Sequence, residues 1–345
     1  MPTSTLTSTS NEGSVKFDER GLLSEYFADG TTQRIQPFIG DGGEARIAVN
    51  GDSSIWFFTD QGVSRIFNGR ITHFTDERSA LAAAFPWTGT QTLWLVAPDG
   101  TLWTIAGGKL VGYNGETWSN IPLDGIMADT VEHVVAGPDG MLAITSASGL
   151  SVYTPEKGWY APPLPEEAPR DRWFGNELLA AADGSLWIGL DFQGSGGLLH
   201  YVPDLQTWTV FDEKNSDLSQ MGIKGLTLDA GGDIWIANDT RGIVAVQRAK
   251  AGVWEYLTRQ SPFPEVYGFG RVYFGAHDEL WLPTIGRCGE NGDPCWQGLA
   301  QYAAGKWKRY TTADGLVSEH VFALAVDPDG VPWLVTDAGL QKFKP

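Results

Sequence analysis

The stretch Asp314–Phe343, "DGLVSEHVFALAVDPDGVPWLVTDAGLQKF", decides the fold of this 345-residue chain. Apolar and polar residues alternate on both sides of "DPDG", which is typical of two β-strands joined by a tight turn. The Asp-Gly step favours that turn because glycine readily adopts positive φ. A Gly-Leu step follows the strand that contains Trp333, and it predicts a further turn and a third strand. The stretch is therefore predicted to form most of one small antiparallel sheet.

The same template recurs along the chain, for example in "TLWLVAPDGTLWTI", "ELLAAADGSLWIG" and "GLTLDAGGDIWIA". Each copy has an apolar strand, a glycine-containing turn and an anchor residue in the next strand, which is tryptophan in all copies but one. The anchor positions are Trp56, Trp103, Ala143, Trp187, Trp235, Trp281 and Trp333. Their spacings of 47, 40, 44, 48, 46 and 52 residues are typical of four-stranded propeller blades.

A tryptophan ring cannot be covered by one small sheet. Packing it against the neighbouring sheet removes on the order of 150–250 Å² per aromatic side chain from water. The repeats therefore predict an all-β fold, a seven-bladed β-propeller of four-stranded antiparallel blades. Each outer strand is expected to carry an aromatic residue, and these residues are Phe74, Trp118, Trp159, Trp208, Trp254 and Trp307.

The last repeat ends at Phe343 without an outer strand. The N-terminal stretch "LLSEYFADGTTQRIQ" resembles "WKRYTTADGLVSEHV", which combines an outer strand with the start of the next repeat. We therefore predict that Leu22–Phe27 pair with the C-terminal blade and close the ring, which removes an unpaired edge. Residues 1–19 are predicted to be a flexible Ser/Thr-rich tail, and residues 20–345 a single propeller domain.

Composition narrows the possible partners. The chain has 42 acidic and 24 basic residues and a net charge of -18, which disfavours nucleic acid and anionic lipid and favours a cation or a neutral ligand. No apolar run is long enough to span a membrane, and the N-terminus lacks the apolar stretch of a signal peptide. Cys288 and Cys295 lie in the turn-rich stretch "CGENGDPC". A disulfide between them would favour an oxidising compartment, and two exposed thiols are the alternative.

Three stretches resemble the two-component regulator propeller repeat: "DGLVSEHVFALAVDPDGVPWLVTDAGLQKF", "ADGSLWIGLDFQGSGGLL" and "AGGDIWIANDTRGI". The resemblance covers residues 20–345, but its motifs are turn and packing residues, so they indicate blades and not chemistry. It implies an extracytoplasmic (periplasmic or secreted) bacterial sensor domain that binds carbohydrates or other small ligands and works with a signalling protein. The chain also resembles, more distantly, the streptogramin B (virginiamycin B) lyases, which implies a metal-assisted elimination that uses His and Glu.

Binding groups are expected where the innermost strands begin, here termed the top face, because loops on a rigid scaffold often carry function. Acidic residues and histidines occur there in Glu132-His133, Glu319-His320, Asn176-Glu177 and Gly43-Glu44. The candidate catalytic residues are Glu132, His133, Glu319 and His320. The candidate ligands of a divalent cation (calcium or magnesium) are Glu44, Glu132, Glu177 and Glu319. The alternative is that these residues are solvated side chains at the start of a strand.

Aromatic residues form a second candidate set. They are expected in connections between blades, where they hold a sugar ring or cap the ends of the core. These residues are Phe85, Trp87, Trp173, Phe174, Tyr267 and Phe269. A third set comes from the insertions "PTIGRCGENGDPCWQG" and "DFQGSGG", which are expected to rise on the top face, the former with Arg287 and Trp296. The candidate ligand-binding residues are Trp87, Trp173, Asn176, Glu177, Tyr267, Arg271, Trp296, His133 and His320.

The other histidines are His73 and His200, which are expected on outer strands, and His277, expected in a turn at the opposite end of its blade. All three are predicted to be structural or solvated. The function that the sequence favours is recognition of a small neutral ligand, such as a carbohydrate, at the top face. A metal-assisted lyase or hydrolase and a protein-interaction scaffold are the alternatives, because fold does not fix function.

Overall fold

The computed structural model of the chain describes most of the repeats. The described residues are 12–27, 29–37, 39, 45, 47–50, 52–59, 62–74, 94–97, 99–106, 108–114, 117–123, 125–126, 131–146, 149–166, 175–192, 195–212, 215–216, 218, 223–229, 231–240, 243–250, 253–258, 262–263, 266–269, 271–275, 279–288 and 293–345.

The protein is an all-β propeller of small antiparallel sheets. Within the described residues, the helical segments are two short 3-10 turns, η3 (Pro138–Gly140) and η4 (Thr312–Asp314). None of the helices in this part of the chain has the length and apolar character needed to cross a membrane. The chain divides into two compact units: unit 1 comprises Met1–Leu123 and Tyr310–Pro345, and unit 2 comprises Asp124–Arg309.

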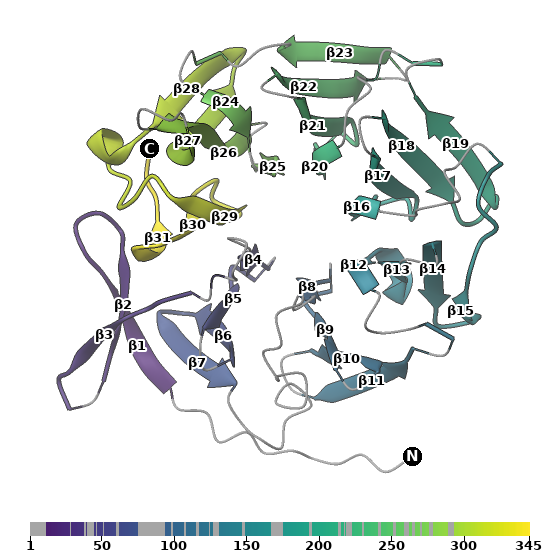
Figure 1. Cartoon of the computed structure of the whole chain (residues 1–345). Coiled ribbons are helices and arrows are strands. Elements are labelled where there is room, and N and C mark those ends of the chain that lie inside the picture. Colours follow the sequence, from purple (N-terminus) through teal and green to yellow (C-terminus); the bar gives the residue numbers. More distant parts are fainter. Residues whose placement is uncertain are drawn as a thin grey trace. The chain divides into compact units, whose positions relative to one another are not determined.

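Unit 1 contains three sheets among its described residues (Figure 1). The largest has the strand order β3-β2-β1-β7-β6-β5-β4, the second is β11-β10-β9-β8, and the third is β29-β30-β31. The strands are β1 (Glu12–Phe17), β2 (Leu23–Tyr26), β3 (Thr32–Arg34), β4 (Ile47–Val49), β5 (Ile55–Thr59), β6 (Gly62–Phe67), β7 (Arg70–Phe74), β8 (Trp94–Val96), β9 (Leu102–Ala106), β10 (Lys109–Tyr113), β11 (Trp118–Pro122), β29 (Val321–Val326), β30 (Pro332–Thr336) and β31 (Gly339–Lys342).

Unit 2 contains four sheets among its described residues, each built from strands that follow one another in the sequence. The strands are β12 (Val131–Ala136), β13 (Leu142–Ser146), β14 (Gly149–Thr154), β15 (Gly158–Tyr160), β16 (Gly175–Ala180), β17 (Leu186–Phe192), β18 (Ser195–Val202), β19 (Thr207–Phe211), β20 (Ile223–Leu228), β21 (Ile234–Thr240), β22 (Ile243–Lys250), β23 (Val253–Thr258), β24 (Val266–Phe269), β25 (Tyr273–Phe274), β26 (Leu280–Cys288), β27 (Asp293–Ala303) and β28 (Lys306–Tyr310).

The predicted set of seven equivalent four-stranded blades is not confirmed. Five sheets, β8–β11, β12–β15, β16–β19, β20–β23 and β24–β28, have the predicted form with four or five strands. The other two sheets depart from it, because β1–β3 extend the sheet of β4–β7 and β29–β31 form a sheet of three strands. Glu12–Phe17, within the segment predicted as a tail, form β1 and pair with both β2 and β7.

The predicted ring closure is corrected by the same strands. Leu23–Tyr26 do not form the outer strand of the C-terminal sheet, because β2 pairs with β1 and β3 instead. The N-terminal segment contacts β31 through an isolated antiparallel bridge between Leu22 and Gln341 and two backbone hydrogen bonds, from Lys342 N to Gly21 O at 2.9 Å and from Leu340 N to Ile35 O at 3.3 Å. Gly21 has φ +76°, and an added Cβ would collide with the Lys342 carbonyl, so glycine is required there.

Gln341 joins the C-terminal sheet to the N-terminal segment through its side chain. The residue is fully buried, and its Nε2 donates to Arg20 O at 2.7 Å and to Gly315 O at 2.9 Å. Its Oε1 accepts from Val317 N at 3.2 Å. The N-terminal segment is therefore attached to β31 as predicted, but by a few backbone hydrogen bonds and the Gln341 side-chain amide and not by a full strand.

The prediction that an anchor tryptophan is shielded by a neighbouring sheet is confirmed for Trp56, Trp235 and Trp333. In unit 1, Trp333 lies in one cluster with Ile55 and Phe57 of the β4–β7 sheet, and Trp56 lies in another with Leu102 of β9. In unit 2, Trp235 of β21 clusters with Leu280 and Leu282 of β26. Five of the predicted outer-strand aromatics lie on the last strand of their sheets, from Trp118 on β11 to Trp307 on β28, whereas Phe74 lies on β7, which also pairs with β1.

In two repeats, an aspartate of the turn before the anchor tryptophan accepts a hydrogen bond from the indole N–H. Asp327 accepts from Val331 N at 2.8 Å through Oδ1 and from Trp333 Nε1 at 3.0 Å through Oδ2. Asp229 accepts from Trp235 Nε1 at 3.0 Å in the same way. A buried indole N–H without an acceptor would be costly, so this aspartate is as much a part of the repeat as the tryptophan.

Candidate functional site

The innermost strands of unit 2 share a β-bulge near their first residue. The register shifts between Val131 and His133 in β12, Gly175 and Glu177 in β16, Ile223 and Gly225 in β20, and Val266 and Gly268 in β24. The residues at the four bulges are Glu132, Asn176, Lys224 and Tyr267. Bulges often redirect a strand beside a functional site. Three residues that the sequence singled out, Glu132, Asn176 and Tyr267, therefore occupy one equivalent backbone position.

Tyr267 and Phe269 were predicted to lie in a connection between blades, but both lie on strand β24. The reason is the length of the partner strand β26, which continues to Cys288 and pairs with Val266–Phe269. The innermost strand of this sheet is interrupted between β24 and β25. Arg271 lies in this interruption.

The structure brings two predicted ligand-binding residues, Glu177 and Arg271, into contact. Arg271 Nε lies 3.0 Å from Glu177 Oε1, and the side chains are 43% and 11% exposed, respectively. Glu177 is on β16 and Arg271 is on the segment between β24 and β25, so the ion pair links two sheets that are not consecutive in the chain. The sheet of β20–β23 comes between them in sequence.

Gly225 of β20 explains how Arg271 approaches Glu177. A Cβ built on Gly225 would lie 2.5 Å from Val272 N and 3.2 Å from Arg271 Cα, so only glycine lets that backbone come so close. Gly189 of β17 plays a similar part, because a Cβ there would lie 2.8 Å from Ile223 Cγ2 and 3.4 Å from Glu177 Cβ. Two glycines thus allow the three sheets to approach one another at this end.

Glu132 and His133 lie on β12 and not ahead of it. Burial raises the pKa of the Glu132 carboxyl, so the group is more readily protonated than an exposed glutamate. His133 is half-buried and pairs with Thr145 of β13 in the register. Their place at the strand start agrees with a position on the top face of unit 2, while the proposed acid–base role stays a prediction.

Glu319 and His320 of unit 1 lie directly before β29, as predicted, and each has a partner. Glu319 Oε1 accepts from Thr312 Oγ1 at 3.3 Å, and His320 Nδ1 lies 3.3 Å from Asp337 Oδ2. Both contacts are at the protein surface, where ion pairs contribute little stability. Glu319 and His320 are therefore accessible to a ligand, but each side chain contacts a different residue.

The described candidates do not form a metal site by themselves. In the part of the chain that the structure describes, no group of three His, Cys, Asp or Glu side chains is placed to hold a metal ion. Glu177 is paired with Arg271 instead, and Glu44 lies outside the described residues. A calcium or magnesium ion at the top face thus stays a prediction.

Several aromatic candidates also lie outside the described residues. They are Phe85, Trp87, Trp173 and Phe174, together with His277. Asn176 and Tyr267 are placed by their backbone only. Trp296 is described on β27 as a half-buried residue that pairs with Ile285 of β26. Trp296, the candidate from the predicted insertion, therefore lies on the β26–β27 hairpin.

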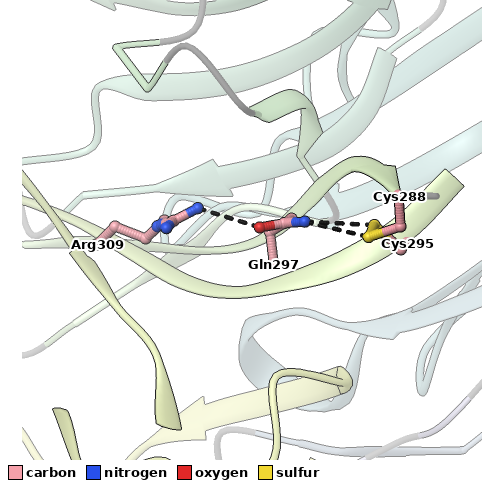
Figure 2. Close-up of a disulfide and its surroundings, with 4 residues drawn as sticks. All are labelled: Cys288, Cys295, Gln297 and Arg309. Atoms are coloured by element: carbon pink, nitrogen blue, oxygen red, sulfur yellow. Dashed lines mark hydrogen bonds between the residues drawn. A yellow bond between two sulfur atoms is a disulfide. The ribbon is translucent and has the colours of Figure 1, made fainter. Parts of the chain in front are cut away.

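The disulfide predicted as one alternative is present: Cys288 and Cys295 are bonded, with Cα atoms 5.8 Å apart. The hairpin of β26 and β27 extends to the pair Cys288 and Asp293, so the bridge lies at its outer end. Figure 2 shows Gln297 between the disulfide and Arg309. Gln297 Nε2 donates to Cys295 Sγ at 3.3 Å and to Cys288 Sγ at 3.4 Å. Arg309 Nη1 donates to Gln297 Oε1 at 3.3 Å.

His73 is structural, as predicted. Its Nδ1 lies 2.8 Å from Ser64 Oγ and its Nε2 lies 3.0 Å from Glu25 Oε2. The composition resembles a Ser-His-Glu catalytic triad, but Ser64 is fully buried, so a substrate cannot reach its hydroxyl. The network instead connects β2 to β6 and β7 in unit 1.

His200 is also structural, although it lies on β18, the third strand of its sheet, and not on the outer strand. Its ring stacks on Trp187 with the ring centroids 3.9 Å apart. Burial lowers the pKa of His200, and the nearby Asp183 opposes this shift. The stacked imidazole therefore favours its neutral form.

Comparison with known proteins supports the fold. No protein-family profile and no curated protein sequence matches the chain. Among solved structures, a streptogramin B lyase is similar with a TM-score of 0.65 and 15% identity, over 90% of this chain and 96% of the lyase. YCF48 bound to a D1 peptide has a TM-score of 0.60 and 14% identity, over 90% of this chain and 96% of that one.

The extracellular domain of a hybrid two-component system protein from B. thetaiotaomicron is also similar. Its TM-score is 0.56 at 16% identity, over 86% of this chain and 39% of that one. The neighbours thus include both groups that the sequence resembled, extracellular domains of two-component systems and streptogramin B lyase, and all are propellers. At such low identity, the likeness shows the fold.

Sequence reasoning did not identify Gly225, Gln297 or Arg309 as functional candidates. Gly225 carries a detectable signal, because it follows the bulge of β20 where the equivalent residues of β12 and β16 are His133 and Glu177. Gln297 and Arg309 carry none, because they come from two strands and meet only when β27 and β28 are placed side by side.

Proposed function

We propose that the chain is a sensor-type propeller that binds a small neutral ligand with several hydroxyl groups, such as a carbohydrate. The proposed site lies at the start of the innermost strands of unit 2. The observation that carries the proposal is the contact between Glu177 and Arg271, with the Arg271 side chain 43% exposed. The same proposal includes the finer expectation that the seven sheets are the blades of one ring.

The chemistry of this ion pair suits a polyol. The guanidinium donates hydrogen bonds and the carboxylate accepts them, while a hydroxyl group can do both. Because the two charges compensate each other, a neutral ligand does not leave an unpaired charge when it displaces water. An anionic ligand would instead meet the repulsion of Glu177 and of a chain with net charge -18.

The predicted aromatic residues complete this proposal. Trp296, on the β26–β27 hairpin, is proposed to face a sugar ring, and Tyr267, Trp87 and Trp173 are proposed to do the same. Asn176 is proposed to bind a hydroxyl group from its bulge on β16. The histidines His133 and His320 are proposed as further polar contacts.

A thermal-shift measurement tests the proposal, because a ligand that binds the native state raises its melting temperature. The probes are neutral mono- and disaccharides, with sodium glucuronate as the anionic comparison. The wild-type protein is expected to respond to at least one neutral sugar. Arg271→Ala is expected to lose that response, whereas Lys306→Ala, an exposed lysine of β28, is expected to keep it. Absence of a response to the whole neutral panel, or its survival in Arg271→Ala, would contradict the proposal.

Gly225→Ala sharpens the same experiment. The added methyl group cannot fit beside Val272 N without a shift of the Arg271 segment. We expect Gly225→Ala to bind the sugar more weakly than the wild type and to keep the wild-type circular dichroism spectrum. The control variant Lys306→Ala is expected to bind the sugar as the wild type does. Equal affinity in Gly225→Ala and wild type would show that the position of Arg271 does not determine binding.

An extracytoplasmic location belongs to this proposal. It is supported by the disulfide, which persists in oxidising compartments, and by the fold shared with an extracellular sensor domain. The proposed partners are the small ligand and a signalling protein that reads its binding. Nucleic acid is not proposed as a partner because of the acidic net charge.

A second candidate is a scaffold that binds a peptide, favoured by the similarity to YCF48 in its complex with a D1 peptide. A response of the wild-type protein to peptides and not to sugars would support this function. A metal-assisted lyase or hydrolase is the remaining alternative. A stabilising effect of calcium or magnesium that chelator removes, and that Glu319→Ala with His320→Ala abolishes, would support it.

A further inference from the structure

The end of the β26–β27 hairpin carries a second chemical group that the proposed ligand site does not use. The Cys288–Cys295 disulfide lies there, with Cys288 exposed and Cys295 half-buried. A disulfide is open to attack by a thiolate only if one sulfur can be reached from solvent. Exposure makes Cys288 the sulfur that an incoming thiol reaches more easily.

The other requirement is a stabilised leaving group. Gln297 Nε2 lies 3.3 Å from Cys295 Sγ and 3.4 Å from Cys288 Sγ, as a donor to both (Figure 2). A disulfide sulfur is a weak acceptor, whereas a thiolate is an anion that accepts strongly. The hydrogen bond from Gln297 thus becomes stronger when the disulfide opens, which favours the opened state.

Arg309 of β28 strengthens this effect. Its Nη1 donates to Gln297 Oε1 at 3.3 Å, which polarises the amide so that its N–H group becomes a better donor. The positive charge itself also favours a nearby thiolate. Arg287 directly precedes Cys288, and its side chain is exposed. It adds a further positive charge to the hairpin.

We propose that Cys288–Cys295 is a thiol-exchange site that reacts with a low-molecular-weight thiol. The thiolate of the small molecule attacks Cys288 Sγ, a new S–S bond forms, and the Cys288–Cys295 bond breaks with its electron pair on Cys295 Sγ. Gln297 and Arg309 are positioning residues that stabilise the Cys295 thiolate. A second molecule of the thiol releases Cys288, so two electrons pass to the protein and two small thiols become one disulfide.

The exchange has a consequence for the hairpin. Cys288 pairs with Asp293 at the end of the β26–β27 ladder, and the disulfide is a covalent cross-link between the two strands near that point. Cys295 is followed directly by Trp296 and Gln297. Opening the bond therefore releases the end of the strand that carries Trp296, which connects the redox state of the hairpin to a proposed ligand contact.

The rate of exchange with reduced glutathione tests the proposal on the whole chain. Samples are quenched by alkylation at set times, and peptide mass spectrometry locates the first mixed disulfide. Gln297→Leu is expected to slow exchange about tenfold, because it removes a hydrogen bond to the leaving thiolate. Arg309→Gln is expected to have a smaller effect in the same direction. Gln301→Leu, the same change farther along β27, is expected to react at the wild-type rate.

Two results would overturn the proposal: a wild-type rate in Gln297→Leu, or glutathione attached first to Cys295. A pH profile separates stabilisation of the thiolate from a merely structural role of Gln297. In Cys288→Ser, the alkylation of Cys295 by iodoacetamide is expected to reach half its maximal rate at a lower pH than in Cys288→Ser combined with Gln297→Leu. Equal midpoints would exclude any effect of Gln297 on the thiolate.

Discussion

The sheets β29–β31 and β24–β28 start from the same sequence pattern and end differently. In β30, Thr336 lies three residues after Trp333, and its Oγ1 donates to Gly339 O at 2.8 Å, where the hairpin turns. In β26, Thr284 lies three residues after Trp281, but the hairpin continues to Cys288. Among the residues that the structure describes, the buried Thr284 hydroxyl has no hydrogen-bond partner.

This difference shows how one repeat serves two purposes. The short hairpin of β30 and β31 is closed by its own threonine and glycine, and it belongs to the framework of unit 1. The long hairpin of β26 and β27 projects beyond the repeat, and a disulfide closes it instead. The extension also provides the partner residues that let β24 form. The segment directly after β24 contains Arg271, which contacts Glu177.

The largest expected effect concerns the aspartate that anchors the short sheet. Asp327→Ala removes the acceptor of Val331 N and Trp333 Nε1 and the partner of Lys342 Nζ, which lies 3.0 Å from Asp327 Oδ2. We expect a loss of about 3 kcal/mol in the free energy of unfolding, measured by urea denaturation. Asp329→Ala, an exposed residue of the same turn, is the control and is expected to change little. Equal losses in the two variants would contradict this role of Asp327.

The next effect concerns the attachment of the N-terminal segment to the short sheet. Gln341→Leu leaves Arg20 O, Gly315 O and Val317 N without their partner, and a loss of about 2 kcal/mol is expected. Hydrogen exchange is expected to speed up in β31, and protection in β26 and β27 is expected to stay unchanged. Gln33→Leu, on the exposed strand β3, is the matched control. Unchanged exchange in β31 would remove Gln341 as the link.

The two threonines give the most direct test of the comparison. Thr336→Val is expected to destabilise the protein by about 1 kcal/mol, because Gly339 O loses its donor. Thr284→Val is expected to be neutral or slightly stabilising, because the buried hydroxyl has no partner to lose. Threonine and valine have similar shapes, so the packing around each position changes little. Parallel urea titrations of both variants suffice, and equal destabilisation would refute the distinction.

The smallest effect is a dependence on pH. Burial acts to raise the pKa of Asp327, but hydrogen bonds from Val331, Lys342 and Trp333 outweigh it and place the pKa below the ordinary value of 3.8. The folded state thus binds this proton less readily than the unfolded state, and the resulting stability is present above about pH 4 and is lost as the pH falls through the folded pKa. Melting temperatures of the wild type from pH 6 to pH 2.5 are expected to fall more steeply than those of Asp327→Asn. Parallel curves would rule out this contribution.

Much of the fold was predictable because the repeat consists of local signals. The spacing of the anchors, the Asp-Gly turns and the outer-strand aromatics predict small antiparallel sheets whose tryptophans, such as Trp235 and Trp333, need a neighbouring sheet. The mode of closure was not predictable. The similarity of residues 22–27 to an outer strand is real, but whether they pair with β31 or with β1 and β3 depends on competing long-range contacts.

The candidate site was predictable in part. Glu132, Asn176 and Tyr267 share a bulge position, and Glu177 and Arg271 meet, yet the pattern alone did not indicate that Gly225 would permit this contact. Tyr267 was placed in a connection because the length of the partner strand β26 is not encoded next to it. A contact between residues of two strands, such as that of Gln297 with Arg309, produces no recognisable local pattern in the sequence.

The amino-acid sequence by itself determined the small antiparallel sheets, their turns and the need of each tryptophan for a neighbour, because these follow from hydrophobic alternation and local backbone preference. Tertiary structure alone decided that β1–β3 join β7, that Arg271 reaches Glu177 past Gly225, and that Gln297 and Arg309 meet at the disulfide. Such contacts join residues far apart in the chain, and their geometry exists only once the sheets have packed together.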